Sequence, residues 1–398
     1  RRWGWIRPMT IKGKARRFLA AALALVMILL LSGCFDRREL DTIAIVVGVG
    51  LDKGREEGNV RVTLQIANIG SSEQSDPQTA SNEASSFVNV TEEGPAVNYA
   101  VRNMQSKVSR LIYLAHNKVI VIGEEMAKTG INNALDFFVR ASEARLTVNL
   151  LVAEGKAGEI LSTSAYLEQL PGTEIQELIR DQEITSTAPI ITELDFIGTM
   201  IEKSVEAFAP LIKIVEENGE KHLKTSGTAV FKDSKMVGKF DEYETQGMLH
   251  VQDRFQRGVL FVRIQDTPAT IEILDAKTQL RPEVFTDGTV MMHMKLNVTA
   301  GLGDQGEGVN LFTPENMEMV KNAVSDAIKD QIARAIEKAK EYDADIFGFG
   351  KKLSRYYPEQ WKEMAEQWDN LFRSVQYDVE VNVVTKLSGR TTTYIKPQ

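Results

Sequence analysis

The sequence predicts a mixed α/β or α+β protein of three domains, each a β-sheet flanked by helices. Three observations support this prediction. The chain has 398 residues, enough for two or three domains of roughly 100–200 residues each. It is 43% hydrophobic and 26% charged, a composition that allows apolar cores to be buried. After residue 34, apolar runs typical of strands alternate with segments whose apolar residues recur every three or four positions, as in helices.

Residues 1–33 are interpreted as an export signal rather than as part of the fold. A basic stretch at 12–17 is followed by fourteen uninterrupted apolar residues at 18–31 and then by small residues. This order is typical of a secretory signal peptide. Fourteen helical residues span about 21 Å, less than the roughly 30 Å hydrocarbon core, so a permanent membrane span is disfavoured.

Cys34 is the only cysteine in the sequence, which excludes an intramolecular disulfide and a thiolate metal cluster. The sequence Leu31-Ser32-Gly33-Cys34 resembles a lipobox, the cleavage site of bacterial lipoproteins. In a lipobox the signal is cut between Gly33 and Cys34, and the cysteine receives an S-diacylglycerol and an N-acyl group. The alternative is an ordinary signal peptide followed by an incidental buried cysteine. Because the only cysteine falls at the one position that the signal requires, we expect a lipid anchor at Cys34. Two acyl chains give stable anchoring, whereas one gives only marginal membrane binding.

The charge distribution argues against a nucleic-acid partner. Residues 1–33 hold seven Lys/Arg and no acid, so the remainder has 40 basic and 55 acidic residues and a net charge of −15. Binding to phosphates requires clustered Lys/Arg. An acidic body also does not suit a protein held on anionic lipid by charge.

The first domain begins with two strands joined by a polar turn. Gly48-Val-Gly50 lies in the first strand; it lacks the third glycine and the following helix of a dinucleotide-binding loop, so we interpret it as strand. A serine-rich surface loop at 70–86 follows. The remaining expected elements of this domain are strands at 87–91, 119–122 and 148–153 and helices from 95, at 131–140 and from 157.

The middle of the chain is expected to contain helices at 173–184 and 191–204, strands at 208–216, 224–231 and 236–240, a helix from Asp241, and strands at 258–264 and 269–276. After Pro282 we expect a strand at 285–299, a flexible loop at 301–308, a long helix from Thr313, a second helix from Pro358, and two final strands that end near 395. The predicted organisation is a signal peptide at 1–33, an N-terminal α/β domain at 34–190, a middle α+β domain at 191–281 and a C-terminal α+β domain with a long helix at 282–398.

Motifs that carry chemistry are weak in this sequence. Residues 348–352 resemble a phosphate-binding loop only faintly, because Asp345 replaces its first glycine and Lys352 its Ser/Thr. The spacing of Asp343 and Asp345 mimics the start of a calcium loop, but Ser354 stands where the bidentate carboxylate should be. For Asp304 and Glu307, a solvated turn is favoured over a weak calcium site.

For four aromatic residues, a structural role is weighed against a functional one. His116 is interpreted as a structural histidine rather than a general base. His293 lies on the polar face of its strand and is expected to be solvated or paired across strands. Trp361 and Trp368 share one helical face, which favours core packing over ligand stacking. We therefore expect no catalytic residue, cofactor or metal site, and no enzymatic activity.

Several stretches together resemble the Ger(x)C family, the lipoprotein C subunits of spore germinant receptors in endospore-forming Firmicutes. The sequence CFDRREL at 34–40, running into IAIVVGVGLDK, is similar to the opening of the family, with Phe35 where Trp is common. Further similar stretches are HNKVIVIGEE at 116–125, GTAVFKDSKMVG at 227–238, DIFGFG at 345–350, and the segment 358–361 with Trp368.

This resemblance implies a non-enzymatic subunit that is lipid-anchored to the outer face of the spore inner membrane. It would assemble with the integral-membrane A and B subunits of a germinant receptor for nutrient-triggered germination. Recognition of the nutrient is attributed mainly to the B subunit in this family, so no small-molecule ligand is assigned. Two alternatives are a lipid-anchored solute-binding protein of an importer and a lipoprotein enzyme that acts on the cell wall.

Overall fold

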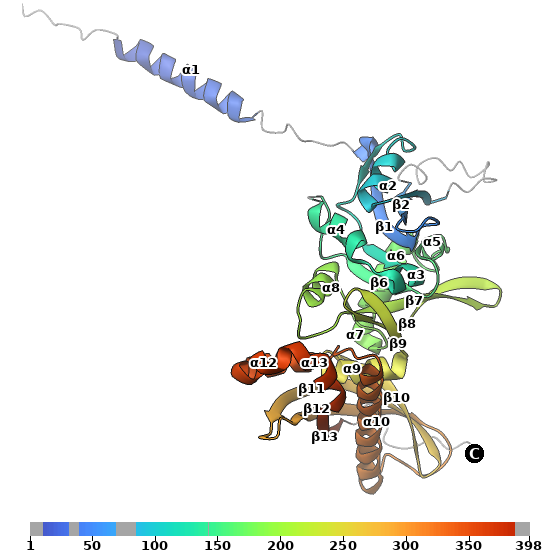
Figure 1. Ribbon diagram of the computed structural model, residues 1–398. Helices are drawn as coiled ribbons and strands as arrows, with labels where there is room; N and C mark the ends of the chain where they lie inside the picture. The colour runs from blue at the N-terminus through green and yellow to red at the C-terminus, as the bar shows by residue number, and fades with distance from the viewer. Residues whose placement is uncertain (1–10, 32–39, 69–84, 142, 387–398) are drawn as a thin grey trace, which may run out of the picture. The chain divides into compact units, whose positions relative to one another are not determined.

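The computed structural model describes residues 11–31, 40–68, 85–141 and 143–386 (Figure 1). The chain divides into two compact units, residues 1–43 and 44–398, which are considered separately. The first unit contains α1 (Ile11–Leu31), which covers the basic and apolar residues of the predicted signal. Within the described residues, no helix has the length and apolar character that a membrane crossing requires.

The mixed α+β class is confirmed, and the described strands of the second unit form two sheets. The first sheet has nine strands in the order β3-β2-β1-β5-β6-β7-β8-β9, with β4 paired to β1. Strands expected in the middle of the chain are shared between the two sheets. The strands of the first sheet are β1 (Ile43–Lys53), β2 (Val60–Ala67), β3 (Phe87–Gly94), β4 (Leu111–Tyr113), β5 (Val119–Ile122), β6 (Asn149–Ala153), β7 (Phe208–Glu217), β8 (Glu220–Lys232) and β9 (Lys235–Phe240).

The centre of the first sheet is parallel. Strands β1, β5, β6 and β7 run in the same direction, so their carboxyl ends meet at one edge of the sheet, here called the carboxyl edge, and their amino ends at the opposite amino edge. All four residues of β5 are fully buried. This explains why β5 is a continuous β-branched run rather than an alternating one, because a parallel strand is covered on both faces.

Helices cover both faces of this sheet. Ile120 and Ile122 share a core with residues of α2 and α4, whereas Val119 and Val121 share a separate core with residues of α5 and α6. The helices are α2 (Val97–Met104), α3 (Glu124–Thr129), α4 (Asn132–Arg140), α5 (Ala157–Ile160), α6 (Pro171–Arg180), α7 (Gln182–Thr185) and α8 (Glu193–Met200).

Gly48 and Gly50 lie within β1, as the sequence predicts, and the structure gives the reason for both glycines. A Cβ atom at Gly48 would lie 2.9 Å from Leu161 Cδ2, and one at Gly50 would lie 3.3 Å from the Cβ of Ala157. Side chains at these positions would push α5 away from the sheet. The two glycines therefore permit close helix packing.

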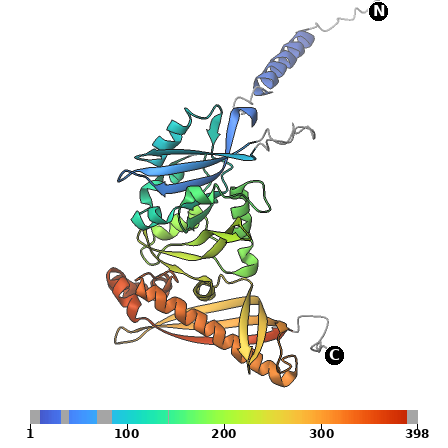
Figure 2. The same ribbon diagram turned by 90° about the vertical axis from the view of Figure 1, so that its right-hand side faces the viewer.

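The second sheet has the order β10-β11-β12-β13, and α10 (Pro314–Glu341) lies along one of its faces (Figure 2). The apolar stripe of α10 is buried as predicted, and the Thr313 side chain accepts a hydrogen bond from the Asn316 backbone N–H at 3.3 Å. The strands are β10 (Gly258–Ile264), β11 (Thr267–Val284), β12 (Val290–Gln305) and β13 (Gln376–Lys386).

One expectation for this region was wrong. Residues 301–305, predicted to lie in a flexible loop, continue β12, because the 18-residue β11 supplies hydrogen-bonding partners beyond residue 299. Pro282, after which the third domain is expected, lies inside β11 opposite Met292. Proline is tolerated there because β10 pairs only with residues 267–273 of β11, so this part of β11 has no β10 neighbour to accept an N–H.

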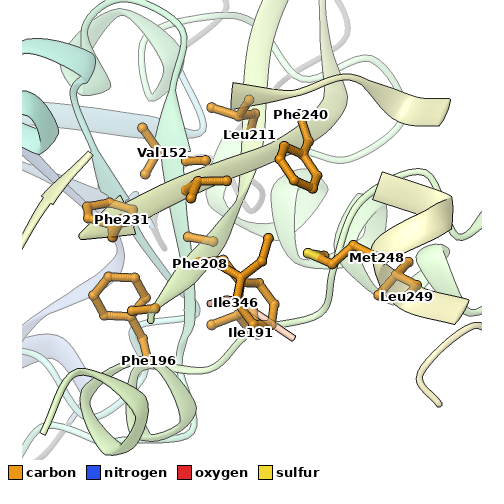
Figure 3. Packing of buried hydrophobic residues seen from close by; sticks show 14 of the residues in the cluster. Val152, Ile191, Phe196, Phe208, Leu211, Phe231, Phe240, Met248, Leu249 and Ile346 are labelled. Carbon is orange, nitrogen blue, oxygen red and sulfur yellow. The ribbon is translucent and has the colours of Figure 1, made fainter. Parts of the chain in front are cut away.

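A buried helix, α9 (Glu242–Val251), packs against α10 beneath the second sheet. The predicted capping box at its start is confirmed, because the Glu244 N–H donates to Asp241 Oδ1 and the Asp241 N–H to Glu244 Oε2, both at 2.8 Å. Met248 and Leu249 of α9 belong to the same core as Phe208 and Phe231 of the first sheet (Figure 3). The remaining helices are α11 (Phe349–Tyr356), α12 (Pro358–Met364) and α13 (Trp368–Ser374).

The limits of the three expected domains stay a prediction. In the structure, residue 191 lies beside the isolated bridge that joins Asn149 to Thr192, and residue 282 lies inside β11.

Candidate functional site

The predicted lipidation site, Cys34, and the predicted cleavage site between Gly33 and Cys34 lie outside the described residues. The anchor therefore stays a prediction from the sequence.

Two cavities, of about 760 and 790 Å³, lie beside α5. One, of about 790 Å³, opens at the carboxyl edge of the first sheet, where open α/β sheets commonly bind ligands. Its floor and walls are mixed in charge: Asp52, Arg55, Arg61, Thr63, Thr91, Glu124, Lys156 and Glu159. The other, of about 760 Å³, lies between residues 159–166 and the β7–β8 hairpin. Tyr166 and His222 both line it, and their rings pack edge to face with centroids 4.6 Å apart.

Asp52 is the most buried carboxylate of the carboxyl-edge cavity, and it holds α5 on the sheet. One of its oxygens accepts the Ala157 N–H at 2.8 Å and the other the Gly158 N–H at 2.9 Å. Burial raises the pKa of Asp52, while the two N–H donors oppose this rise. A Cβ atom at Gly123 would lie only 2.0 Å from Asp52 Oδ1. Both oxygens are thus engaged, which favours a structural role over that of a general base.

Asp345, considered above for calcium and phosphate motifs, anchors the start of α11. Its fully buried carboxylate accepts hydrogen bonds from the backbone N–H groups of Gly348, Phe349 and Gly350 at 2.8–3.1 Å and from Trp368 Nε1 at 3.0 Å. Burial raises the pKa of Asp345 to about 6, against the effect of these four donors. The backbone donors of the loop are therefore satisfied by the protein's own carboxylate and not free for a phosphate.

The tryptophan pair behaves as predicted. Trp368 is buried in the core and meets Trp361 edge to face at 5.4 Å. A Cβ atom at Gly350 would lie 2.7 Å from Trp368 Nε1, so the glycine lets the indole reach Asp345. This confirms core packing for the pair.

The two histidines singled out in the sequence lie on the surface. His116 is exposed, with its ring 5.6 Å from that of Tyr113. His293 pairs across strands, as predicted, through Nε2 with Glu283 at 2.9 Å and Nδ1 with Asp378 at 2.5 Å. Hydrogen bonding to Glu283, together with the nearby Asp378, raises the pKa of His293.

Sequence reasoning missed two buried titratable groups. Glu193, at the start of α8, and His250, in α9, are both fully buried, and neither side chain has a hydrogen-bond partner among the described residues. Burial raises the pKa of Glu193 to about 7 and lowers that of His250 to about 3. The His250 ring stacks on Phe255 at 4.0 Å. The only sequence signal for Glu193 is its place after the helix cap Thr192, a position that is usually exposed.

Across the described parts of the chain, no group of three or more His, Cys, Asp or Glu side chains is arranged to hold a metal ion. Asp304 lies in β12 opposite Thr270, and Glu307 follows the strand, so the structure does not bring them into such a group.

Comparison with known proteins gives two family matches that together span most of the chain. Residues 36–214 match the family described as "Spore germination protein N-terminal domain". Residues 226–389 match "Spore germination B3/ GerAC like, C-terminal".

Curated relatives come from Bacillus subtilis (strain 168). The chain is 26% identical to "Putative spore germination protein YfkR", over 91% of this chain and 93% of that protein. It is 25% identical to "Spore germination protein KC" over 96% and 98% of the two chains, and 25% identical to "Spore germination protein B3" over 90% and 95%.

A solved structure described as "Crystal Structure of the GerBC protein" has the same fold. It superposes with a TM-score of 0.55 and 18% sequence identity, over 88% of this chain and 99% of that chain. The matched segments include the stretches at 116–125, 227–238 and 345–350 that resembled this family in the sequence. The chain belongs to the Ger(x)C family of spore germination proteins.

Proposed function

We propose that this chain is the lipoprotein C subunit of a spore germinant receptor. In this proposal Cys34 carries the lipid anchor, the body lies on the outer face of the spore inner membrane, and the subunit assembles with integral-membrane A and B subunits for nutrient-triggered germination. The observation that carries the proposal is the pair of family matches, which begin at residue 36, two residues after Cys34. Relatives named spore germination proteins KC, B3 and A3 support it over at least 90% of this chain.

The polar groups of the body support a structural rather than a catalytic use. The buried carboxylates of Asp52 and Asp345 are bound by N–H donors, which leaves them poorly placed to move a proton. The two described sheets, of nine and four strands, also differ in connectivity. This difference disfavours the importer alternative, because solute-binding proteins usually have two similar lobes.

The proposal is tested by purifying the tagged native protein from spore inner membranes in detergent and identifying its partners by mass spectrometry. We expect two multi-spanning subunits to be recovered with it. Recovery of an importer permease and its ATPase would instead overturn the proposal.

The anchor is tested separately with Cys34→Ala, for which Ser32→Ala is the matched control because it keeps a small residue and the cysteine. Mass spectrometry of the amino-terminal peptide should find the acyl groups in the control and not in Cys34→Ala. We expect Cys34→Ala to reduce membrane attachment without altering the thermal midpoint of unfolding, because residue 34 precedes the first described strand. An unlipidated but otherwise normal Ser32→Ala protein would contradict the predicted anchor.

A further inference from the structure

Basic residues are concentrated in one part of an otherwise acidic chain. Residues 94–123 contain four Lys/Arg and no Asp or Glu, although the chain after residue 33 has a net charge of −15. The net charge therefore conceals a local basic region.

The fold brings the middle of this region, from the end of α2 to the start of β5, to the amino edge of the first sheet. Strand β3 ends at Gly94, which pairs with Val60, the partner of Lys53 at the carboxyl end of β1. Helix α2 follows and returns the chain toward the start of β5, and α4 likewise leads back toward the start of β6. Both helices thus end at the amino edge.

The start of α8 is tied to the same edge. The Glu193 N–H donates to the Val148 carbonyl at 2.8 Å, and the Leu194 N–H donates to the Leu146 carbonyl at 2.9 Å, just before β6 begins. Helices α4 and α8 both contribute residues to the same core.

Exposed side chains at this edge are basic and apolar together. Leu111, Val139 and Leu194 have exposed fractions of 47%, 51% and 53%. Arg110, Arg140 and Arg145 are exposed beside them in the sequence. We call these six residues the amino-edge surface.

Local hydrogen bonds fix part of this surface. Gln105 Nε2 donates to the Arg110 carbonyl at 2.8 Å, and the Ile112 N–H donates to Gln105 Oε1 at 3.0 Å. The Arg110-Leu111 pair therefore projects from an ordered turn. Three exposed acids adjoin these residues in the sequence: Asp136 pairs with Arg140 at 2.7 Å, Glu143 lies in the loop before β6, and Asp195 accepts the Thr192 N–H at the start of α8.

The predicted anchor joins the chain at this same edge. Ile43, the first residue of β1, follows Cys34 by nine residues, which reach at most about 30 Å when extended. Because β1 has 11 residues, its carboxyl end lies about 36 Å from its amino end.

We infer that the amino-edge surface lies against the anionic lipid surface of the membrane and sets the orientation of the anchored body. This inference rests on the proposed lipid anchor at Cys34. The arginines attract anionic headgroups, and the three apolar side chains enter the headgroup region, as on amphipathic membrane-surface elements. The acidic remainder of the chain is repelled by the same membrane. The anchor therefore attaches the protein, and the amino-edge surface determines which face of the body lies against the membrane.

The test uses the full lipidated chain in vesicles of phosphatidylglycerol and phosphatidylcholine. Because lipidation consumes the thiol of Cys34, an introduced cysteine is the only reactive one. Leu111→Cys and Leu194→Cys carry an environment-sensitive fluorophore, and Val259→Cys and Val384→Cys, with exposed fractions of 56% and 62% in the second sheet, are the matched controls. Spin-labelled lipids quench fluorophores that lie at the bilayer surface.

We expect quenching at residues 111 and 194 to be about two-fold or more stronger than at the controls, and to fall as salt is raised, because headgroup attraction is screened. Equal quenching at all four positions, or quenching at the controls alone, would overturn the inference. Protection of residues 111 and 194 only when integral-membrane subunits are added would assign this surface to a protein partner and would also overturn it.

Charge-reversal variants provide an independent test of the same inference. Arg110→Glu with Arg145→Glu should lower the quenching of the label at residue 194, whereas Lys277→Glu with Arg281→Glu on the second sheet should not. If Arg110 and Arg145 only stabilise the fold, the first pair will shift the thermal midpoint without changing the quenching. Flotation of the vesicles separates the two proposals: a chain that fails to float contradicts the anchor and with it this inference, whereas a floating chain without quenching contradicts this inference alone.

Discussion

The Asp345 side chain connects the start of α11 with the buried Trp368. Asp345 follows the turn after α10, and its carboxylate collects three backbone N–H groups and the indole N–H of Trp368. A fully buried carboxylate is tolerated because every donor around it is matched to an oxygen. The DIFGFG stretch is therefore a helix start built around an internal anion.

Asp345→Asn should be strongly destabilising although it is nearly isosteric. Each oxygen accepts two N–H groups, so an amide NH₂ in either orientation faces two donors and leaves them unpaired. We expect the free energy of unfolding to fall by about 2–4 kcal/mol. Asp369→Asn is the control, because Asp369 is exposed and its surface pair with Lys232 at 2.9 Å should contribute little. A thermal or urea unfolding series measures both, and an equal effect of the two substitutions would contradict this account.

Glu193 gives a pH dependence of opposite sign to that of a paired carboxylate. Its pKa is about 7 in the folded chain and near its ordinary value when unfolded, so between roughly pH 4.5 and 7 only the unfolded chain loses the proton. Stability from this group is present at low pH and is lost as the pH rises through this window. The loss amounts to at most about 3 kcal/mol, since a difference of one in pKa corresponds to about 1.4 kcal/mol.

Glu193→Gln removes the buried charge and should therefore stabilise the protein at pH 8 much more than at pH 4. Thermal midpoints of the variant and the unchanged protein at the two values measure this difference. Glu202→Gln, a variant of a half-buried glutamate that pairs with Lys351, serves as the control and should not become more stabilising as the pH rises. A Glu193→Gln effect that is independent of pH would show that Glu193 does not titrate in this window.

At the scale of the helices and strands, the crossing of α9 and α10 depends on Gly247, which has no side chain. A Cβ atom at Gly247 would lie 2.1 Å from the Gln331 backbone oxygen of α10. The Gln331 side chain, from the same crossing, donates to Gln246 Oε1 at 2.6 Å. Close packing of the two helices thus requires glycine at residue 247 even though glycine lowers intrinsic helix stability.

Gly247→Ala and Gly198→Ala form a matched pair of helical substitutions. Nothing lies within 4 Å of a Cβ atom at Gly198 in α8, so alanine there should stabilise by about 0.5–1 kcal/mol through backbone entropy. Alanine at residue 247 has to displace backbone and should destabilise by about 1–3 kcal/mol or more. Unfolding free energies of the two variants should therefore change in opposite directions, and a stabilising Gly247→Ala would mean that the helices cross differently.

For the molecule as a whole, one apolar core connects the two sheets. Val152 and Phe208 of the first sheet, Met248 of α9 and Met294 of the second sheet belong to a single cluster. The two sheets are therefore expected to lose their structure together.

This predicts coincident unfolding transitions for residues 44–398. Trp361 and Trp368 are the only tryptophans after residue 33, so tryptophan fluorescence reports on the carboxyl-terminal part, whereas far-ultraviolet circular dichroism reports on both sheets. We expect the two signals to give the same midpoint, as a cooperative unit requires. Met248→Ala should lower both midpoints equally, and a fluorescence transition well separated from the dichroism transition would contradict the shared core.

The surroundings of the candidate site residues are also set by the whole molecule. The sequence located Asp345, Trp368 and His293, and their packing and pairing agree with the roles predicted for the tryptophan and histidine. It did not locate Glu193, because a glutamate after a helix cap looks like an exposed first-turn acid. The amino-edge surface was also hidden, since its arginines and leucines come from three separate segments and the total charge is acidic.

By itself the sequence determined the mixed fold class, most strands and helices, the helix caps at Asp241 and Thr313, and the family; the anchor at Cys34 stays its prediction. These features are local, because periodicity, capping and motif order are written in neighbouring residues. Tertiary structure alone decided that the strands of the middle segment divide between two sheets, that 301–305 extend β12, and that Glu193 and His250 are buried. Each of these depends on which distant segment supplies a hydrogen-bonding edge or a covering face. Such contacts join residues that are far apart in the sequence, so no single stretch of sequence indicates them.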